Sequence, residues 1–300
     1  MDYHIPVLLD ECIRGLNIDP DGVYVDATFG GGGHSRVILE KLDNGRMFAF
    51  DQDEDAETNA RDIIDPRFRF ISGNFRHIKK YLKLYEVKKI DGLIADLGVS
   101  SHQIDQPERG FSTRFEGNLD MRMDNTIDIT AGNIINTYSQ ENLQRIFSEY
   151  GEVRNARTLA QVIVRERIRG KILTTQDFTG ILEKLVPGHK RFKYFAQVFQ
   201  ALRIEVNDEI NALKELLMQS AGMLKTGGRL VILSYHSLED RLVKNYLLKG
   251  NFEGTEQKDI YGHSDNPFMA INRKPMMASP GELERNPRAK SARLRIAEKT

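Results

Sequence analysis

Cysteine is almost missing from this chain, and tryptophan is missing altogether. Its 300 residues include one cysteine, Cys12, which excludes an internal disulfide and a metal site built from several thiolates. Cys12 lies in a segment of apolar periodicity, so we expect a buried small side chain. Histidines are scattered without paired ligand spacing, so we expect no bound metal.

Long apolar runs are absent as well. No segment approaches the roughly 20 apolar residues of a membrane-spanning helix, so we expect no membrane partner. Residues 1–4 carry neither a basic region nor an apolar stretch of the signal-peptide type. With the scarcity of cysteine, this favours a cytoplasmic location.

Net charge is the third absence. The 43 Lys and Arg residues balance the 43 Asp and Glu residues, which gives a formal net charge of +0. Such a chain is no generic binder of polyanions, although a local basic stripe can lie within a balanced total.

The order of apolar patterns predicts an α/β fold with an inserted helical module. Apolar strands alternate with helices in the first third, which is typical of crossover connections and a parallel sheet. A polar stretch at about 107–124 and helical periodicity to about 201 interrupt the pattern, which resumes in a helix near 207. We therefore predict one domain from residues 1–106 and 207–300, with residues 107–206 inserted. Strands are expected at 23–28, 46–51, 69–72, 90–97 and 228–234, with an antiparallel pair at 268–272 and 292–297; helices are expected at 35–42, 55–64, 75–85, 140–150, 153–169, 175–185 and 207–224.

The tract from Val23 to Ser35 is the most informative one. It predicts a buried strand, a turn of four glycines and the start of a helix, whose free N–H groups and bare backbone let a ligand approach closely. Two later strands end in Asp51 and Asp96. Parallel strands share one carboxyl edge, so we expect Gly30–His34, Asp51 and Asp96 to converge on one crevice. The alternative for Asp96 is a helix cap.

The chemistry of this crevice favours S-adenosylmethionine over a dinucleotide. Residues 30–35 do not place the third glycine of the dinucleotide fingerprint. Asp26 adds another carboxylate beside the loop. Several carboxylates suit a cationic amine and sulfonium better than a pyrophosphate.

Eight separated motifs then identify a family. They are His4–Leu9, Asp26–Ser35, Asp96–Ser101, Arg109–Ser112, Leu119–Asp124, Phe199–Ile204, Ser234–Arg241 and Asn286–Ser291. Through them nearly the whole chain resembles the bacterial 16S rRNA cytosine-N4 methyltransferase family, also called MraW. The resemblance implies a Rossmann-like class I methyltransferase sheet with an inserted all-helical substrate-recognition domain. It also implies S-adenosylmethionine-dependent N4-methylation of a cytidine in the decoding (P-site) region of 16S rRNA.

The family's cofactor positions map onto seven residues of this chain: Gly32, Gly33, His34, Asp51, Phe75, Asp96 and Gln103. The resemblance implies that Asp51 accepts hydrogen bonds from the ribose hydroxyls, that Phe75 packs against the adenine and that Asp96 lies near the methyl donor. His102 stands where the family commonly has proline, which loosens the turn before Gln103.

Transfer to an exocyclic amine needs an acceptor for its N–H groups. We expect Asp96, or a carbonyl of residues 97–99, to be that acceptor. Phe111 and Tyr235 are candidates to flank the base. For His236 two interpretations stay open: a catalytic or substrate-facing group, or a helix start at Ser237–Asp240 with acids in its first turn.

Basic residues of the insertion are candidates for RNA contact. On a helix over 153–169, one face carries Arg154, Arg157, Arg165 and Arg169, and the other carries Ala156, Leu159, Ala160 and Ile163. That arginine face binds phosphates or is merely solvated. We expect phosphates to bind to Lys190 and Arg191 and bases to stack on the aromatics up to Phe195. Arg109 and Met121–Met123 are expected at the mouth of the crevice, and a basic tail includes Arg285, Arg288, Lys290 and Arg293.

The expected partner is 16S rRNA within the assembled small ribosomal subunit, and the sequence is also compatible with a homodimer. Two other functions stay open. One is an NAD-dependent dehydrogenase. The other is a non-catalytic RNA-binding ribosome assembly factor with a vestigial nucleotide pocket, against which the intact Asp51 and Asp96 argue.

Overall fold

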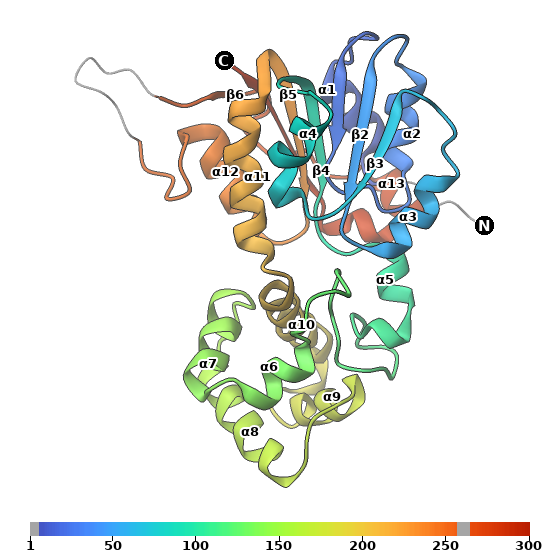
Figure 1. Cartoon of the computed structure of the whole chain (residues 1–300). Coiled ribbons are helices and arrows are strands. Elements are labelled where there is room, and N and C mark those ends of the chain that lie inside the picture. The colour runs from blue at the N-terminus through green and yellow to red at the C-terminus, as the bar shows by residue number, and fades with distance from the viewer. Residues whose placement is uncertain (1–5, 257–264) are drawn as a thin grey trace. The chain divides into compact units, whose positions relative to one another are not determined.

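The computed structural model describes residues 6–256 and 265–300 (Figure 1). The chain forms two compact units, residues 1–98 with 211–300, and residues 99–210. The expected boundaries at 107 and 206 both fall inside the second unit. His4 and Ile5, which open the first motif, lie outside the described residues. Within the described ranges no helix combines the length and the apolar character that crossing a membrane requires.

The first unit contains a seven-stranded sheet in the order β3-β2-β1-β4-β5-β7-β6. Its strands are β1 Val23–Asp26, β2 Arg46–Asp51, β3 Phe68–Ser72, β4 Ile90–Asp96, β5 Leu224–Ser234, β6 Phe268–Ala270 and β7 Arg293–Lys299. Strands β1 to β5 pair in parallel, and β7 pairs antiparallel to both β5 and β6. The predicted parallel sheet and the final antiparallel pair are confirmed. The strand order reverses between β1 and β4, where open α/β sheets bind ligands at the carboxyl ends of the strands.

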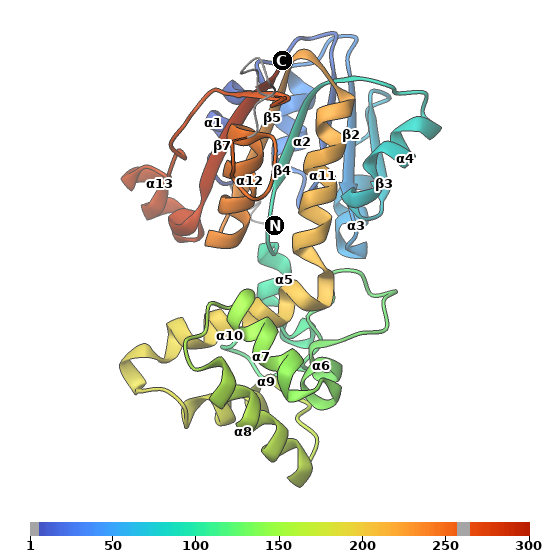
Figure 2. The same cartoon turned by 90° about the vertical axis from the view of Figure 1, so that its left-hand side faces the viewer.

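Helices cover both faces of this sheet (Figures 1 and 2). They are α1 Leu9–Leu16, α2 Gly33–Glu40, α3 Glu54–Arg61, η1 Phe75–His77, α4 Ile78–Leu84, α11 Glu209–Met223, α12 Ser237–Lys249, α13 Pro280–Arg285 and η4 Pro287–Ser291. Val25 packs in one core cluster with α4, α11 and α12, whereas its neighbour Tyr24 packs in the other with α1, α2 and α3. This alternation follows from the two-residue period of a strand. Cys12 of α1 is buried, as expected.

The second unit is built from helices around its own core. Its helices are α5 Ser101–Asp105, η2 Pro107–Arg109, α6 Ala131–Thr137, α7 Gln140–Glu149, α8 Ala156–Arg169, α9 Thr175–Glu183, η3 Gly188–Lys190 and α10 Arg191–Asn207. Phe147, Phe178 and Leu202 are fully buried in its core cluster. Within this unit the only strand-like pairing is an isolated bridge between Asn118 and Thr174.

A buried ion pair attaches β7 to α12, the helix that begins after His236. Asp240 of α12 accepts hydrogen bonds from Arg295 Nε at 2.6 Å and from Arg293 Nη1 at 3.2 Å. The Arg295 side chain is 5% exposed, and Asp240 supplies the counter-charge beside it. Arg293, expected in a basic tail, is therefore engaged in the fold.

Asp240→Ala removes this partner and leaves the Arg295 guanidinium buried without a counter-charge. We expect the free energy of unfolding to fall by about 3 to 5 kcal/mol, measured by urea titration. Asp62→Ala, at the exposed end of α3, is the matched control and should change little. Equal stability of both variants would contradict the assignment.

Candidate functional site

The glycine loop after β1 is packed on one side and open on the other. Gly30 and Gly32 have φ angles of +52° and +75°, in the left-handed region that favours glycine. A Cβ on Gly32 would lie 2.6 Å from the Phe29 ring, and one on Gly33 would overlap Pro6. In contrast, among the described residues no atom other than those of the chain neighbours lies within 4 Å of where a Cβ on Gly30 or Gly31 would be. A ligand therefore has room to reach the backbone at Gly30 and Gly31.

Asp51 at the end of β2 connects this loop to the next turn. Its Oδ2 accepts the Gly30 N–H at 2.7 Å, and its Oδ1 accepts the Asp53 N–H at 2.9 Å. Burial raises the pKa of Asp51 to about 6 despite these hydrogen bonds. Each carboxylate oxygen has two lone pairs, so Asp51 retains acceptor capacity for hydroxyl groups.

Asp26 and Thr28 join the ends of β1 and β4. The Asp26 carboxylate is 2% exposed and accepts the Ser35 hydroxyl at 2.7 Å and the Thr28 N–H at 3.0 Å. The Thr28 hydroxyl oxygen accepts the Asp96 N–H at 2.6 Å. Burial raises the pKa of Asp26 to about 6. A chain of hydrogen bonds thus fixes the backbone at the point where the strand order reverses.

Asp96 ends β4 and accepts one short hydrogen bond from a distant tyrosine. The Tyr235 hydroxyl donates to Asp96 Oδ1 at 2.6 Å. Burial raises the pKa of Asp96 to about 7, with Asp26 and Glu239 adding to the rise and the Tyr235 hydrogen bond opposing it. The pKa of Tyr235 lies well above its usual 10, mainly through burial, so Tyr235 stays a donor.

The alternative that Asp96 caps a helix is wrong. The N-cap of α5 is Ser100, whose hydroxyl accepts the Gln103 N–H at 3.1 Å. Asp96 therefore remains available for chemistry at the sheet edge. The Tyr235 hydroxyl is engaged with Asp96, and contact of the Tyr235 ring with the base stays a prediction.

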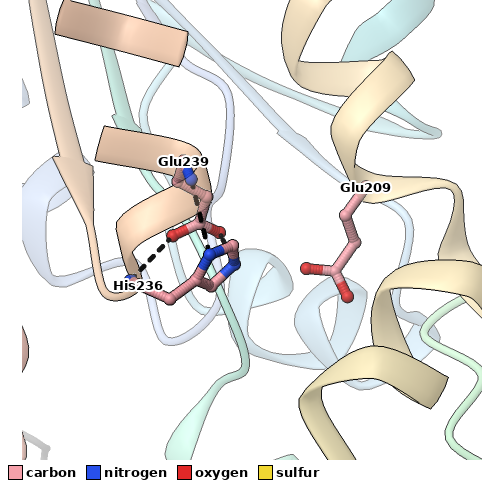
Figure 3. Close-up of side chains that lie close together, drawn as sticks. All are labelled: Glu209, His236 and Glu239. Carbon is pink, nitrogen blue, oxygen red and sulfur yellow. Dashed lines mark hydrogen bonds and ion pairs between the residues drawn. The ribbon is translucent and has the colours of Figure 1, made fainter. Parts of the chain in front are cut away.

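His236 begins α12 as its N-cap residue (Figure 3). Its Nδ1 accepts the Glu239 N–H at 3.4 Å, while Glu239 Oε2 accepts the Tyr235 N–H at 2.9 Å. The predicted helix start at Ser237 is confirmed, whereas a catalytic role of His236 remains a prediction. Glu209, also drawn in Figure 3, belongs to the second unit, where it accepts a hydrogen bond from Arg203 Nε at 2.8 Å.

His34, at the start of α2, is a buried and neutral histidine. Burial lowers its pKa to about 4, so the ring carries no charge at neutral pH. Its Nε2 is buried and has no hydrogen-bond partner among the described residues. An unpaired buried nitrogen is costly, and a ligand at the glycine loop could satisfy it.

Phe75 lies close in the chain to two contacts that join the ends of β2 and β3. The Gly73 N–H donates to the Asp51 carbonyl at 2.7 Å, and Asn74 Nδ2 donates to Gln52 Oε1 at 2.7 Å. Phe75 follows directly and is half-buried against the core. Gly32, Gly33, His34, Asp51, Phe75 and Asp96 thus all belong to the carboxyl edge of the first unit's sheet. Gln103 belongs to the second unit, where its Oε1 accepts the Ser100 N–H at 3.0 Å.

These features fit the expected S-adenosylmethionine. The bare backbone at Gly30 and Gly31 leaves room for it, and His34 Nε2 lacks a partner. The carboxyl groups of Asp26, Asp51 and Asp96 all have raised pKa values because they are buried together. A cation at this edge would offset that burial cost. Sequence reasoning gave no role to Thr28 or to the Glu239 carboxylate, whose side chains accept hydrogen bonds from the backbone N–H groups of Asp96 and Tyr235.

The arginine face of α8 is largely as predicted. Ala156, Leu159, Ala160 and Ile163 are buried, whereas Arg157, Arg165 and Arg169 are exposed. Two details differ. The helix begins at Ala156, so Arg154 precedes it although it is exposed. Glu166 pairs with Arg165 at 3.4 Å and with Arg169 at 3.1 Å, which partly neutralises both cations.

The aromatics near Lys190 are mostly unavailable for stacking on bases. Phe192 is 81% exposed, but Tyr194 and Phe195 are buried in the helical core of the second unit. Lys190 is exposed, and Arg191 forms an ion pair with Glu183 at 3.1 Å. The helical period of α10 turns these two aromatics inward, which the charge pattern alone does not reveal.

Arg109 and Phe111 stabilise the irregular segment after α5. Arg109 Nη2 donates to the Arg122 carbonyl at 3.0 Å, and its guanidinium lies 5.9 Å from the centre of the Phe111 ring. Met121 is fully buried in the helical core, so the expectation that its side chain lines a crevice mouth is wrong. RNA contact by Arg109 and Phe111 remains a prediction.

Gly31→Val tests the open side of the glycine loop. A side chain fits there without a clash, so we expect an unchanged unfolding temperature. We also expect binding of S-adenosylmethionine to weaken about tenfold, or about 1.4 kcal/mol, in isothermal titration calorimetry. Gly32→Ala is the contrasting variant, because its φ angle and the Phe29 ring should make it lose stability. Wild-type affinity of Gly31→Val would show that the ligand does not pass over this glycine.

The sequence and the fold of this chain are similar to those of known proteins. The family described as "MraW methylase family" matches residues 1–300. Ribosomal RNA small subunit methyltransferase H of Cytophaga hutchinsonii is 59% identical over 297 residues, covering 99% of this chain and 99% of the relative. The protein of the same name from Flavobacterium psychrophilum is 54% identical over 293 residues, covering 97% and 100%. A solved putative methyltransferase from Streptococcus mutans in complex with SAH is 15% identical, with a TM-score of 0.43 over 99% of this chain and 100% of that one.

Proposed function

Because the chain belongs to the MraW methylase family, we propose that it methylates one cytidine of small-subunit ribosomal RNA at N4. It is a methyltransferase with a Rossmann-like sheet, and S-adenosylmethionine is its methyl donor. The observation that carries the proposal is the cluster of buried carboxyl groups beside the open glycine loop. The relatives' name, ribosomal RNA small subunit methyltransferase H, supports the choice of RNA.

Different residues of the sheet edge bind different parts of the cofactor. When bound, S-adenosylmethionine supplies a methyl group on a positively charged sulfur. Asp51 accepts hydrogen bonds from the ribose hydroxyls, and Phe75 packs against the adenine. The backbone of Gly32 and Gly33 and the ring of His34 border the same ligand, whereas a cofactor contact of Gln103 remains a prediction from the family resemblance.

Asp96 activates the amine. The N4 lone pair of cytosine is delocalised into the ring, so the amine becomes a better nucleophile when an acceptor holds its N–H groups. Tyr235 occupies Asp96 Oδ1, while Oδ2 accepts no hydrogen bond within the described residues. The amine donates to Oδ2 and, after transfer, gives up its proton there. A pKa of about 7 suits that step at neutral pH.

The second unit recognises the RNA. We assign this task to residues 107–206, with Arg157 of α8 and Lys190 as exposed cations for phosphate contact. The target base leaves its stack to reach the cofactor. The proposed substrate is the decoding (P-site) region of 16S rRNA within the small subunit, and the enzyme acts in the cytoplasm. His236 faces the substrate and is not an obligatory base.

Mass spectrometry of ribosomal RNA nucleosides tests this function. A strain that lacks the gene should lose N4-methylcytidine from 16S rRNA, and the wild-type gene should restore it. An Asp96→Ala gene should fail to restore it, which separates an enzyme from an assembly factor. An unchanged N4-methylcytidine level in the deletion strain would falsify the proposal.

Tyr235→Phe tests how the carboxyl group of Asp96 is tuned. The Tyr235 hydrogen bond lowers the pKa of Asp96, so its loss raises that pKa. Asp96 accepts the proton of the amine only when its carboxyl group is ionised. Activity therefore rises with pH through the pKa of Asp96. We expect the acid limb of the kcat/KM profile to move to higher pH, with a large loss at about pH 6.5 that closes at high pH.

Tyr246→Phe is the matched control, since Tyr246 is buried in the core of the first unit. Its profile should overlay that of the wild type. If the acid limb of the kcat/KM profile did not move in Tyr235→Phe, Asp96 would not be the proton acceptor.

A further inference from the structure

The irregular segment of residues 110–119 is fixed against α9 in the second unit. The Thr175 hydroxyl donates to the Phe115 carbonyl at 2.7 Å and accepts the Gly117 N–H at 3.1 Å. A Cβ on Gly117 would overlap the Pro107 carbonyl oxygen, so the chain passes there at the closest approach the backbone allows. The Leu119 N–H donates to the Leu173 carbonyl at 2.9 Å. A polar segment without regular structure is thereby held in one conformation, as is typical of binding loops.

A cavity of about 390 Å³ lies between this segment and α9. One wall is formed by residues 113–116 and the other by the α9 residues from Thr175 to Glu183. All of its lining residues belong to the second unit. A single nucleotide is of the size that such a cavity accommodates.

The lining combines a flat surface with groups that form hydrogen bonds. Phe115 is 45% exposed although it is aromatic. Across the cavity, no described residue outside this stretch of α9 has an atom within 4 Å of where a Cβ on Gly180 would be, so the helix surface there is bare. Gln176 and Thr179 supply polar groups beside them. An aromatic ring, a bare helix surface and nearby amide and hydroxyl groups are what an unstacked base requires.

The charges of the lining favour a nucleotide over a free anion. Arg114 is exposed and forms no ion pair among the described residues, so it is available to a phosphate. Glu116 and Glu183 lie on the two walls, and their carboxylates repel a small anion but accept hydrogen bonds from base N–H groups. Glu183 already pairs with Arg191, which keeps its charge balanced.

We propose that this cavity binds one unstacked nucleobase of the substrate RNA, in addition to the cytidine that is methylated. The inference rests on the proposed function, because it takes RNA as the substrate. It assigns Phe115 to stacking, Arg114 to the adjoining phosphate and Gly180 to the open wall. The pocket thus contributes to the choice of RNA sequence, whereas the chemistry belongs to the first unit.

Gly180→Leu places a bulky side chain in the cavity without removing any contact. Glycine weakens a helix interior, so this variant should unfold at an equal or higher temperature. At the same time we expect its affinity for a single-stranded RNA of the decoding region to fall about 5- to 150-fold, the range that loss of base stacking produces. Phe115→Ala should lose affinity within the same range. Gly222→Leu, at an open glycine of α11, is the matched control and should bind RNA like the wild type.

A scan of abasic RNAs identifies the base that occupies the pocket. Each RNA lacks one base, and fluorescence anisotropy measures its affinity for the full chain. With the wild type, one position other than the target cytidine should weaken binding. With Gly180→Leu, the same position should have no further effect, because the leucine side chain already keeps the base out of the pocket.

Two results would overturn the pocket: unchanged RNA affinity of Gly180→Leu, or an abasic position that affects wild type and Gly180→Leu equally. Neither result would contradict the proposed function. A separate assay of methyl transfer to unmethylated small subunits tests that function. If the wild type transferred no methyl group there, the proposed function would fail, and the abasic scan would still decide whether the pocket binds RNA.

Discussion

The burial of three carboxyl groups at one edge of the sheet is the constraint on which the rest of the first unit depends. Asp26, Asp51 and Asp96 each end a strand or follow one, and burial raises the pKa of each. The native state therefore holds protons that the unfolded chain releases, so the free energy of unfolding falls as the pH rises from about 4 to about 7. The fold accepts this cost at the place where a positively charged ligand can offset it.

The surrounding structure holds these groups in position. Thr28 connects β1 to β4, Tyr235 brings β5 to Asp96, and Glu239 fixes the backbone before α12. The ion pair between Asp240 and Arg295 then ties α12 to β7. These contacts involve the ends of β1, β4 and β5 together with β7 and α12, so the geometry of the edge depends on segments far apart in the sequence. Methyl transfer gains most from such preorganisation, because its amine nucleophile is weak.

Much of this could be predicted because it is local in the sequence. The strand of residues 46–51 was predicted with its observed bounds, since an apolar run between a turn and a carboxylate leaves little choice. The convergence of Gly30–His34, Asp51 and the end of β4 follows from the rule that parallel strands share a carboxyl edge.

What the sequence did not reveal depends on packing between distant segments. Tyr235 and Asp96 are 139 residues apart, and no periodicity links them. Met121 and Tyr194 read as parts of a polar, cationic surface, yet the helical core buries both side chains. The cavity beside Gly180 lies between α9 and an irregular segment that Thr175 holds by two hydrogen bonds, and such a contact leaves no periodic pattern in the sequence.

The central claim is that the acidic edge is completed by a cation, and proton release on ligand binding tests it most directly. Calorimetry at about pH 6.5, in buffers of different ionisation enthalpy, counts the protons exchanged when S-adenosylmethionine binds. A bound sulfonium lowers the pKa of the nearby carboxyl groups, so the account predicts net proton release, larger than with S-adenosylhomocysteine, which lacks that charge. Proton uptake, or equal exchange with both ligands, would contradict it.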